Sequence, residues 1–212
     1  MKKHLEDRLV AAMEHFANAS AVLPPVPRLI LLVVLGCSFA YFLGAGARTF
    51  TSSGTDDTGA IWAQISFGFT GALPTMTLGL LVPIRLYNAL GAIAILICSL
   101  TLYEWARHTI RGRSFHIAWS GDVPEALCDR GPYAYIRHPI YASYVLAFLA
   151  VLVALPTLIT LVVFVFNVGL FTHAALSDER SLASGTFAAQ YSQYKKRTGM
   201  FLPRIVRREA RR

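Results

Sequence analysis

The sequence predicts an all-α protein, a polytopic membrane helix bundle of about five transmembrane helices with a cytosolic C-terminal helix. Two observations lead to this fold class. Of the 212 residues, 55% are hydrophobic and only 15% are charged, whereas about a quarter of the residues in a typical soluble domain are charged. The apolar residues also gather in long runs, close to the roughly 20 residues with which a helix crosses a bilayer.

The first element is a predicted surface helix over residues 4–17. Leu5, Leu9 and Met13 fall on one face of this helix, with Phe16 beside them. This pattern is typical of an interfacial amphipathic helix, and an ordinary packing helix fits it equally well. The prolines of "LPPVP" (23–27) end the helix. From the charged start and the late first apolar run, we expect no cleavable signal peptide.

Five apolar runs follow, each interpreted as one transmembrane span. Pro156 separates the last two spans and predicts a tight hairpin between them. The predicted spans cover residues 29–47, 61–84, 87–106, 140–155 and 156–176. Residues 107–139 are expected to form one long loop, and residues 177–200 a cytosolic helix followed by a basic tail. The chain thus divides into an N-terminal amphipathic segment (1–28), two N-terminal spans (29–84) and a core (85–212).

The distribution of positive charge predicts the orientation. Fifteen Lys and Arg residues lie on the side of the long loop and the C-terminus, against five on the other side. Basic residues prevail on the cytoplasmic side of membrane proteins, so the loop and the C-terminus should face the cytoplasm. A bacterial inner membrane or an endomembrane would suit such a protein. The net charge is +8, and no nucleic-acid-binding motif accompanies it. The basic side chains of the tail are therefore expected to contact anionic lipid headgroups.

The three cysteines, at positions 37, 98 and 128, form no disulfide framework or CxxC motif. We interpret them as buried free thiols. His108 and His116 are not at a spacing that suits a metal ion, so no metal site is predicted.

The stretch "GPYAYIRHPIY" (131–141) carries the strongest signal for chemistry. Pro139 suits the first position of the fourth span, where the free N–H groups and the helix dipole attract an anion. Arg137 and His138 stand beside that position. Aromatic rings, which can hold a flat heterocycle or a cation, surround it at Tyr133, Tyr135, Tyr141 and Tyr144. Composition alone favours the plainer interpretation, in which these side chains anchor a helix end at the membrane interface.

Acidic residues follow the fifth span on the same predicted side. Asp178 and Glu179 are adjacent there, where basic residues should prevail. Ser177 or Asp178 could cap a helix over residues 178–196, which leaves Glu179 without a capping role. His173 lies in the last predicted turn of the span, and an ionisable residue there is either functional or a snorkelling anchor.

The C-terminal stretch places Phe187, Tyr191 and Tyr194 on one helix face, which indicates packing against the fold. The basic residues 195–197 beside them are expected to meet anionic lipid. At the exit of the third span, Glu104 is expected to pair with a basic residue three or four positions later.

These motifs resemble those of membrane methyltransferases related to isoprenylcysteine carboxyl methyltransferase and phospholipid methyltransferases. Three motifs carry the resemblance, in order: "GPYAYIRHPIY", the acidic pair followed by Leu182, and "YSQYKKRTGMFLPRI". It covers about residues 85–205. It implies S-adenosylmethionine as the methyl donor, in a non-Rossmann pocket built from segment 131–141, the last two spans and the C-terminal helix. A lipophilic acceptor would then enter from the bilayer.

The resemblance also implies roles for residues. Catalytic roles fall to Glu179, His173 and Arg137. Donor binding falls to Tyr133, Arg137, His138, Pro139, Tyr141, Asp178, Glu179 and Tyr194. The sequence departs from the family pattern at one point, because members often carry an Arg about four residues before the acidic pair. His173 and Ala174 occupy that region here. This difference disfavours a carboxylate acceptor such as isoprenylcysteine and keeps a lipid amine, phenol or thiol open.

Two other classes stay open at this point. A steroid-reductase-like membrane reductase, dependent on NADPH, also carries an Arg-His-Pro, but its motif usually continues with Asn-Tyr, whereas Ile140 and Tyr141 follow here. A non-catalytic membrane scaffold would bind no nucleotide and would tolerate replacement of His138 or Glu179.

Overall fold

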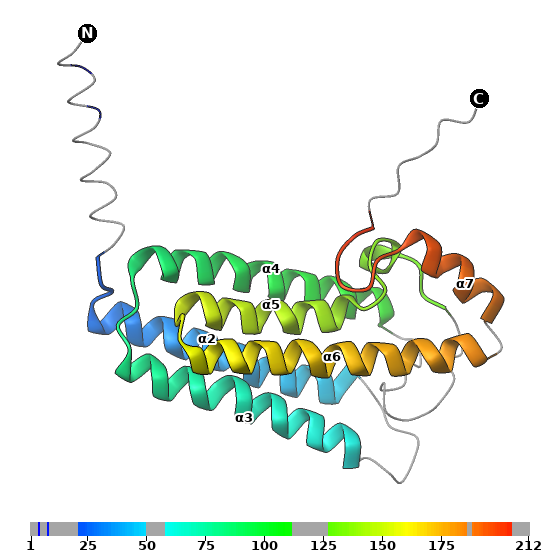
Figure 1. Cartoon of the computed structure of the whole chain (residues 1–212), viewed down its shortest axis with the longest axis horizontal. Helices are drawn as coiled ribbons and strands as arrows, with labels where there is room; N and C mark the ends of the chain where they lie inside the picture. The colour runs from blue at the N-terminus through cyan, green and yellow to red at the C-terminus, as the bar shows by residue number, and fades with distance from the viewer. Residues whose placement is uncertain are drawn as a thin grey trace.

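The computed structural model describes residues 21–49, 58–111, 127–185 and 188–204, together with His4 and Arg8, and of residues 47–49 and 58–67 only the backbone. The predicted N-terminal amphipathic helix and the end of the basic tail therefore lie almost wholly outside the described residues. Figure 1 shows a bundle of long helices with a short helix packed across one end. No strand occurs in the described part of the chain, which has only two isolated bridges.

The described residues form six α-helices and one short 3-10 helix. Five helices run along the bundle: α2 (Pro25–Thr49), α3 (Thr58–Leu81), α4 (Leu86–Ile110), α5 (Pro139–Ala154) and α6 (Leu158–Ser184). The 3-10 helix η1 (Gly131–Ala134) precedes α5, and α7 (Ala188–Arg197) follows α6. The predicted fold class, a polytopic membrane helix bundle, is confirmed.

Helices α2, α4 and α6 are long and apolar enough to cross a membrane, over Pro25–Gly46, Leu86–Ile110 and Leu158–Ser184. Shorter apolar stretches cover Gly68–Leu81 of α3 and Pro139–Ala154 of α5. Large apolar side chains such as Ile30, Val162 and Phe166 are exposed on the bundle. Such exposure is costly in water and natural against lipid, so it agrees with a membrane location.

Local sequence explains where the helices of the last hairpin begin and end. Pro139 occupies the first position of α5, as predicted. Helix α5 ends at Ala154, two residues before Pro156. Thr157 then caps α6 in a capping box with Thr160, in which each side chain accepts a hydrogen bond from the other residue's backbone N–H. One proline and one pair of threonines therefore define the turn of this tight hairpin.

Helix α6 differs from the predicted boundaries. We expected a new helix to begin at Ser177 or Asp178, but α6 runs unbroken from Leu158 to Ser184. The reason is that residues 173–184 contain no proline or glycine and hold good helix formers, so the helix continues past the apolar run. It stops only before Gly185. The alternative in which Ser177 or Asp178 caps a new helix is therefore wrong, and both acidic residues project from the interior of a helix.

Two smaller predictions are also corrected. The expected loop 107–139 is shorter, because α4 extends to Ile110 and residues 131–134 form η1; residues 112–126 are not described. The three cysteines are free, as predicted, but only Cys128 is buried. Cys37 and Cys98 are exposed, because they lie on outward faces of α2 and α4.

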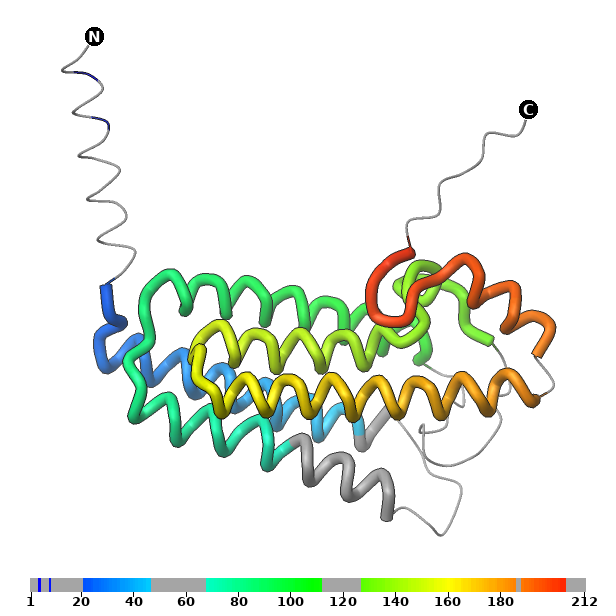
Figure 2. Tube along the Cα trace, viewed as in Figure 1, coloured from blue at the N-terminus to red at the C-terminus, as the bar shows by residue number. Residues whose placement is uncertain are grey.

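Close packing at one end of the bundle positions the candidate site. The C-terminal part of α6, helix η1, the start of α5 and helix α7 meet at the end opposite the α5–α6 turn (Figure 2). Buried aromatic side chains fill the bundle beneath them, including Phe42, Tyr103 and Phe148. The ring of Phe42 packs edge-on against Tyr103, with centroids 4.9 Å apart.

Candidate active site

The backbone after α7 is paired with the backbone before α5. The N–H of Arg137 donates to the carbonyl of Gly199 at 2.8 Å, and the N–H of Gly199 donates to the carbonyl of Tyr135 at 3.2 Å. His138 continues the pairing by donating to Met200 at 3.1 Å. This short parallel bridge ties the Arg-His-Pro segment to the end of α7, more than 60 residues later.

Gly199 is required for this pairing by space. A Cβ atom at position 199 would lie 1.8 Å from the carbonyl oxygen of Leu202, which is a backbone atom and cannot turn aside. A side chain would therefore force the 199–202 turn apart and loosen the paired segment. The glycine of "RTGMFLP" is thus a positioning element of the site.

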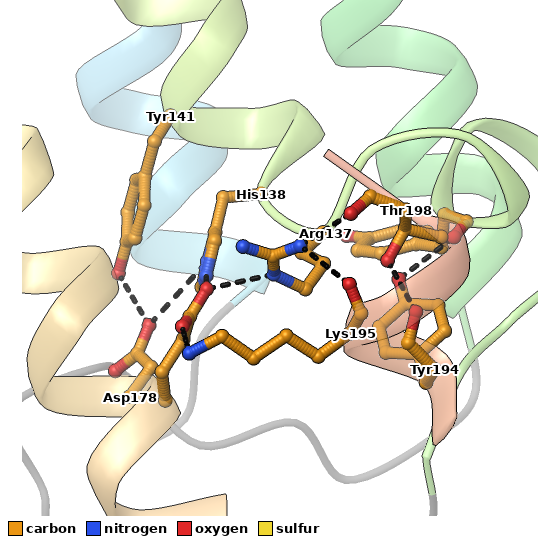
Figure 3. Close-up of polar contacts among 9 residues, drawn as sticks. Arg137, His138, Tyr141, Asp178, Tyr194, Lys195 and Thr198 are labelled. Atoms are coloured by element: carbon orange, nitrogen blue, oxygen red, sulfur yellow. Dashed lines mark hydrogen bonds and ion pairs between the residues drawn. The ribbon is translucent and has the colours of Figure 1, made fainter. Parts of the chain in front are cut away.

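Arg137 and His138 meet Glu179 where the paired segment faces α6. Figure 3 shows Arg137 and His138 between Asp178 and Lys195. The Nε of Arg137 donates to Oε1 of Glu179 at 2.7 Å, and Nε2 of His138 lies 3.5 Å from the same oxygen. The side chain of Glu179 is only 3% exposed, and those of Arg137 and His138 are each 9% exposed. A carboxylate this deeply buried is stable only when paired.

Helix α7 contributes a second cation. The Nζ of Lys195 lies 2.6 Å from Oε2 of Glu179 (Figure 3). Arg137 is tied to the same region, because its Nη1 donates to the carbonyl oxygen of Thr198 at 2.5 Å and to that of Lys195 at 3.4 Å. The carboxylate of Glu179 therefore joins α6 to both α7 and the segment before α5.

Asp178 lies beside this cluster and contacts the tyrosine of the same motif. The hydroxyl of Tyr141 donates to Oδ2 of Asp178 at 3.2 Å, and Nδ1 of His138 lies 4.0 Å from that oxygen. The rings of His138 and Tyr141 are stacked, with centroids 5.6 Å apart and planes 10° apart. The ring of Phe171 continues the stack 5.9 Å beyond Tyr141. A charged cluster thus borders an aromatic wall that runs into the bundle.

Burial shifts the pKa of two groups at this end of the bundle. It lowers the pKa of His138, an effect that the neighbouring Glu179 partly opposes, so the imidazole is neutral near pH 7. Burial likewise raises the pKa of Tyr194 above its ordinary range. The Tyr194 hydroxyl, which is protonated near pH 7, donates to the carbonyl oxygen of Tyr133 at 2.7 Å.

The predicted site residues do not all gather. Arg137, His138, Tyr141, Asp178 and Glu179 form the cluster, with Pro139 buried at the start of α5 beside them. The ring of Tyr133 instead packs against the hydrophobic core, and Tyr194 meets the backbone of Tyr133 rather than the acidic pair.

His173 stands apart from the cluster. Its side chain is exposed on α6. An α-helix has 3.6 residues per turn, so the side chain of His173 points in a direction about a third of a turn away from those of Asp178 and Glu179. Its predicted catalytic role stays a prediction, and any such role would be exerted from the outer face of the helix. The buried position one residue later is Ala174.

Sequence reasoning missed three contributors to the site. Lys195 was assigned to lipid headgroups, yet its ammonium reaches Glu179. Thr198 and Gly199 act through backbone carbonyls, which have no signature in the side-chain sequence. Among these three residues, only the glycine at position 199 offered a signal in the sequence.

Outside the cluster, Glu104 pairs with Arg107 at 2.6 Å and lies 3.4 Å from His108, as predicted.

A second feature of this end is a polar cleft along α7. Its volume is about 570 Å³, and its lining residues are Leu127, Asp129, Gln190, Gln193, Tyr194 and Arg197. The ion pair between Arg197 and Asp129, 2.7 Å long, crosses this side of α7.

The chain was compared with models of protein families. The model of the isoprenylcysteine carboxyl methyltransferase (ICMT) family matches residues 90–184, a little under half of the chain. The match extends from α4 to the last residue of α6 and includes Arg137, His138 and Glu179. Neither the comparison with curated proteins nor the comparison with solved structures gave a match. The family match confirms the resemblance seen in the motifs and supports a membrane methyltransferase in general.

Proposed function

From the match of residues 90–184 to the ICMT family, we propose that the protein is an integral membrane methyltransferase that uses S-adenosylmethionine and methylates a lipophilic acceptor. The observation that carries this proposal is the buried cluster of Arg137, His138 and Glu179 at one end of an apolar helix bundle. A cluster in this position can be reached from both water and the bilayer, so a charged donor can enter from water and an apolar acceptor from the lipid. The end that carries the cluster faces the cytoplasm in this proposal, as the distribution of basic residues indicates.

The chemistry of the cluster fits this donor. The amino-acid end of S-adenosylmethionine carries one ammonium and one carboxylate, so it requires both an anion and a cation. The cluster holds both kinds of charge, with Glu179 and Asp178 as anions and Arg137 and Lys195 as cations. The stacked rings of His138 and Tyr141 offer a face to a sulfonium, since aromatic rings attract cations.

When bound, S-adenosylmethionine supplies an activated methyl group, whose carbon gains a bond from the acceptor's lone pair as the carbon–sulfur electron pair stays on sulfur. The protein's own contribution is to align the two reactants and to exclude water. The stacked rings of His138, Tyr141 and Phe171 form an apolar wall suited to excluding water. An acceptor hydroxyl, amine or thiol also releases one proton, which Asp178 or bulk water can take.

The acceptor is proposed to be a lipid or another small apolar molecule that enters sideways between helices. The exposed apolar faces of α2 and α6 suit contact with lipid along the length of the bundle. The aromatic wall of His138, Tyr141 and Phe171, extended by the Tyr144 ring beside Phe171, leads from the apolar interior of the bundle to the charged cluster.

The test is calorimetric titration of S-adenosylmethionine into the detergent-purified protein, with NADPH titrated in parallel. We expect binding of S-adenosylmethionine only, weakened at least about tenfold by Glu179→Gln. Glu104→Gln is the matched control, because Glu104 is also paired with an arginine but lies outside the cluster. Binding of NADPH alone would move the protein to the reductase class. A folded protein that bound neither ligand would favour a scaffold.

A further inference from the structure

We infer that Lys195 is a further donor-binding residue. When S-adenosylmethionine binds, the Lys195 ammonium leaves Glu179 and pairs with the carboxylate of the donor. This inference rests on the proposed function and deepens it. It assigns the donor's carboxylate to α7, whereas the sequence suggested the start of α5 and the neighbouring Arg137. Four features of the cluster support it.

The first feature is that Arg137 is already committed. Its Nε donates to Glu179 at 2.7 Å and its Nη1 donates to the carbonyl of Thr198 at 2.5 Å. Its side chain is 9% exposed, and its own backbone N–H is bonded to Gly199. Moving this guanidinium would break several buried hydrogen bonds at once, each costly to lose without replacement. Arg137 therefore serves as the fixed partner of Glu179.

The second feature is that Lys195 is held lightly. Its side chain is 52% exposed and approaches Glu179 from the solvent side. Its Nζ forms an ion pair with Oε2 of Glu179 at 2.6 Å, and no other contact of this ammonium holds it in place among the described residues. A lysine ammonium on a flexible four-carbon stem can move several ångströms without disturbing the backbone.

The third feature is the balance of charge. In this structure two cations, Arg137 and Lys195, contact the single carboxylate of Glu179. The ammonium of the donor would be repelled by Lys195 if both stood at the same oxygen. When Lys195 moves to the donor's carboxylate, Oε2 of Glu179 is released to the donor's ammonium. Every charge then keeps a partner, which a buried site requires.

The fourth feature is the position of the alternative site. Helix α5 begins with Pro139, which has no N–H, and the next residue, Ile140, is buried. His138 caps the helix without a side-chain hydrogen bond and is neutral near pH 7. The start of α5 therefore offers no exposed charge to an anion, whereas Lys195 offers a full one.

Two lysines and two ligands test the inference. Lys195→Met removes the charge and keeps most of the stem, and Lys196→Met is the matched control on the adjacent, exposed residue. Each variant is titrated with S-adenosylmethionine and with decarboxylated S-adenosylmethionine, which lacks the carboxylate. We expect Lys195→Met to weaken binding of the complete donor at least about tenfold and Lys196→Met to change it less than about twofold. Neither variant should weaken binding of the decarboxylated donor.

The outcomes separate the inference from the proposed function. If Lys195→Met weakened both ligands equally, the role of Lys195 would be structural, and if it weakened neither, another group would hold the carboxylate; either result overturns the inference. Lys195→Arg, which keeps the charge, should restore most of the affinity. A wild-type protein that failed to bind either ligand would overturn the proposed function itself, before any variant is compared.

Discussion

Arg137 and Glu179 form a buried ion pair, 2.7 Å long, between residues that are 42 positions apart in the sequence. Arg137 precedes α5 and Glu179 lies near the end of α6, so the pair closes the end of the α5–α6 hairpin that lies opposite its turn. Helix α7 and the residue after it also contact this pair, because Lys195 lies against Glu179 and the carbonyl of Thr198 accepts a hydrogen bond from Arg137. The stability of this end and the proposed donor site therefore depend on the same contacts.

The first prediction concerns this ion pair. Arg137→Ala should lower the free energy of unfolding by about 3–5 kcal/mol, because it leaves a buried carboxylate without its main partner. Thermal unfolding in detergent measures the loss. The matched control is Arg107→Ala, which removes an arginine whose pair with Glu104 is about 30% exposed and should cost under about 1 kcal/mol. Equal losses in the two variants would contradict a special role for the buried pair.

The second prediction concerns Gly199. Gly199→Ala should abolish donor binding and lower the unfolding temperature, because its Cβ would meet the Leu202 carbonyl at 1.8 Å and force the paired segment away from Arg137. Gly169→Ala is the control, since a Cβ there meets nothing within 4 Å. Calorimetry and thermal unfolding report the two effects. Retained donor affinity in Gly199→Ala would show that the backbone pairing does not position the site.

The third prediction concerns pH. Burial lowers the pKa of His138 below its ordinary value of 6.5, so the unfolded chain binds this proton more readily than the folded protein does. The stability contributed by neutral His138 should be complete above about pH 7 and should decline as the pH falls from 6.5 through the lowered pKa. His138 faces Asp178 and Glu179 from α6, and Lys195 and Arg137 from its other sides.

The measurement is the unfolding temperature between pH 7.5 and 5 for the wild type and for His138→Gln. The variant should lose this component of the pH dependence and keep the contribution of the carboxylates. Parallel curves for the two proteins would mean that the histidine does not titrate in this window.

The fourth prediction concerns His173. Its exposed position on α6 lies six residues before Glu179, about 9 Å along the helix axis. From there it can meet an acceptor at the membrane interface but not the donor cluster. His173→Ala should leave donor affinity within about twofold and lower turnover, which radiolabelled methyl transfer to lipid extracts would measure. Unchanged turnover would identify His173 as an interface anchor only.

Much of the site was accessible to sequence reasoning. Arg137, His138, Tyr141 and the acidic pair were all predicted, since ionisable and aromatic residues at the edges of apolar runs are conspicuous in a membrane protein. The start of α5 at Pro139 was predicted for a local steric reason. The capping of a new helix at Asp178 was wrong, because a helix ends where a glycine or proline stops it and not where the bilayer does.

The roles of Lys195, Thr198 and Gly199 could not be predicted in this way. Their contribution depends on which carbonyl or ammonium reaches Arg137 and Glu179 after α7 folds back onto the start of α5. Nothing in the local pattern of "YKKRTG" distinguishes Lys195 from Lys196, although one contacts a buried carboxylate and the other is exposed at the next position.

The sequence by itself determined the helical class, the apolar spans and the residue types available for chemistry, because hydropathy and helix-breaking residues act over short stretches of chain. Only the tertiary structure decided the partners: Arg137 with Glu179, Lys195 with the same carboxylate, and His173 apart from both. The physical reason is that a buried charge must find an opposite charge within a few ångströms, and that partner comes from whichever segment the bundle brings there.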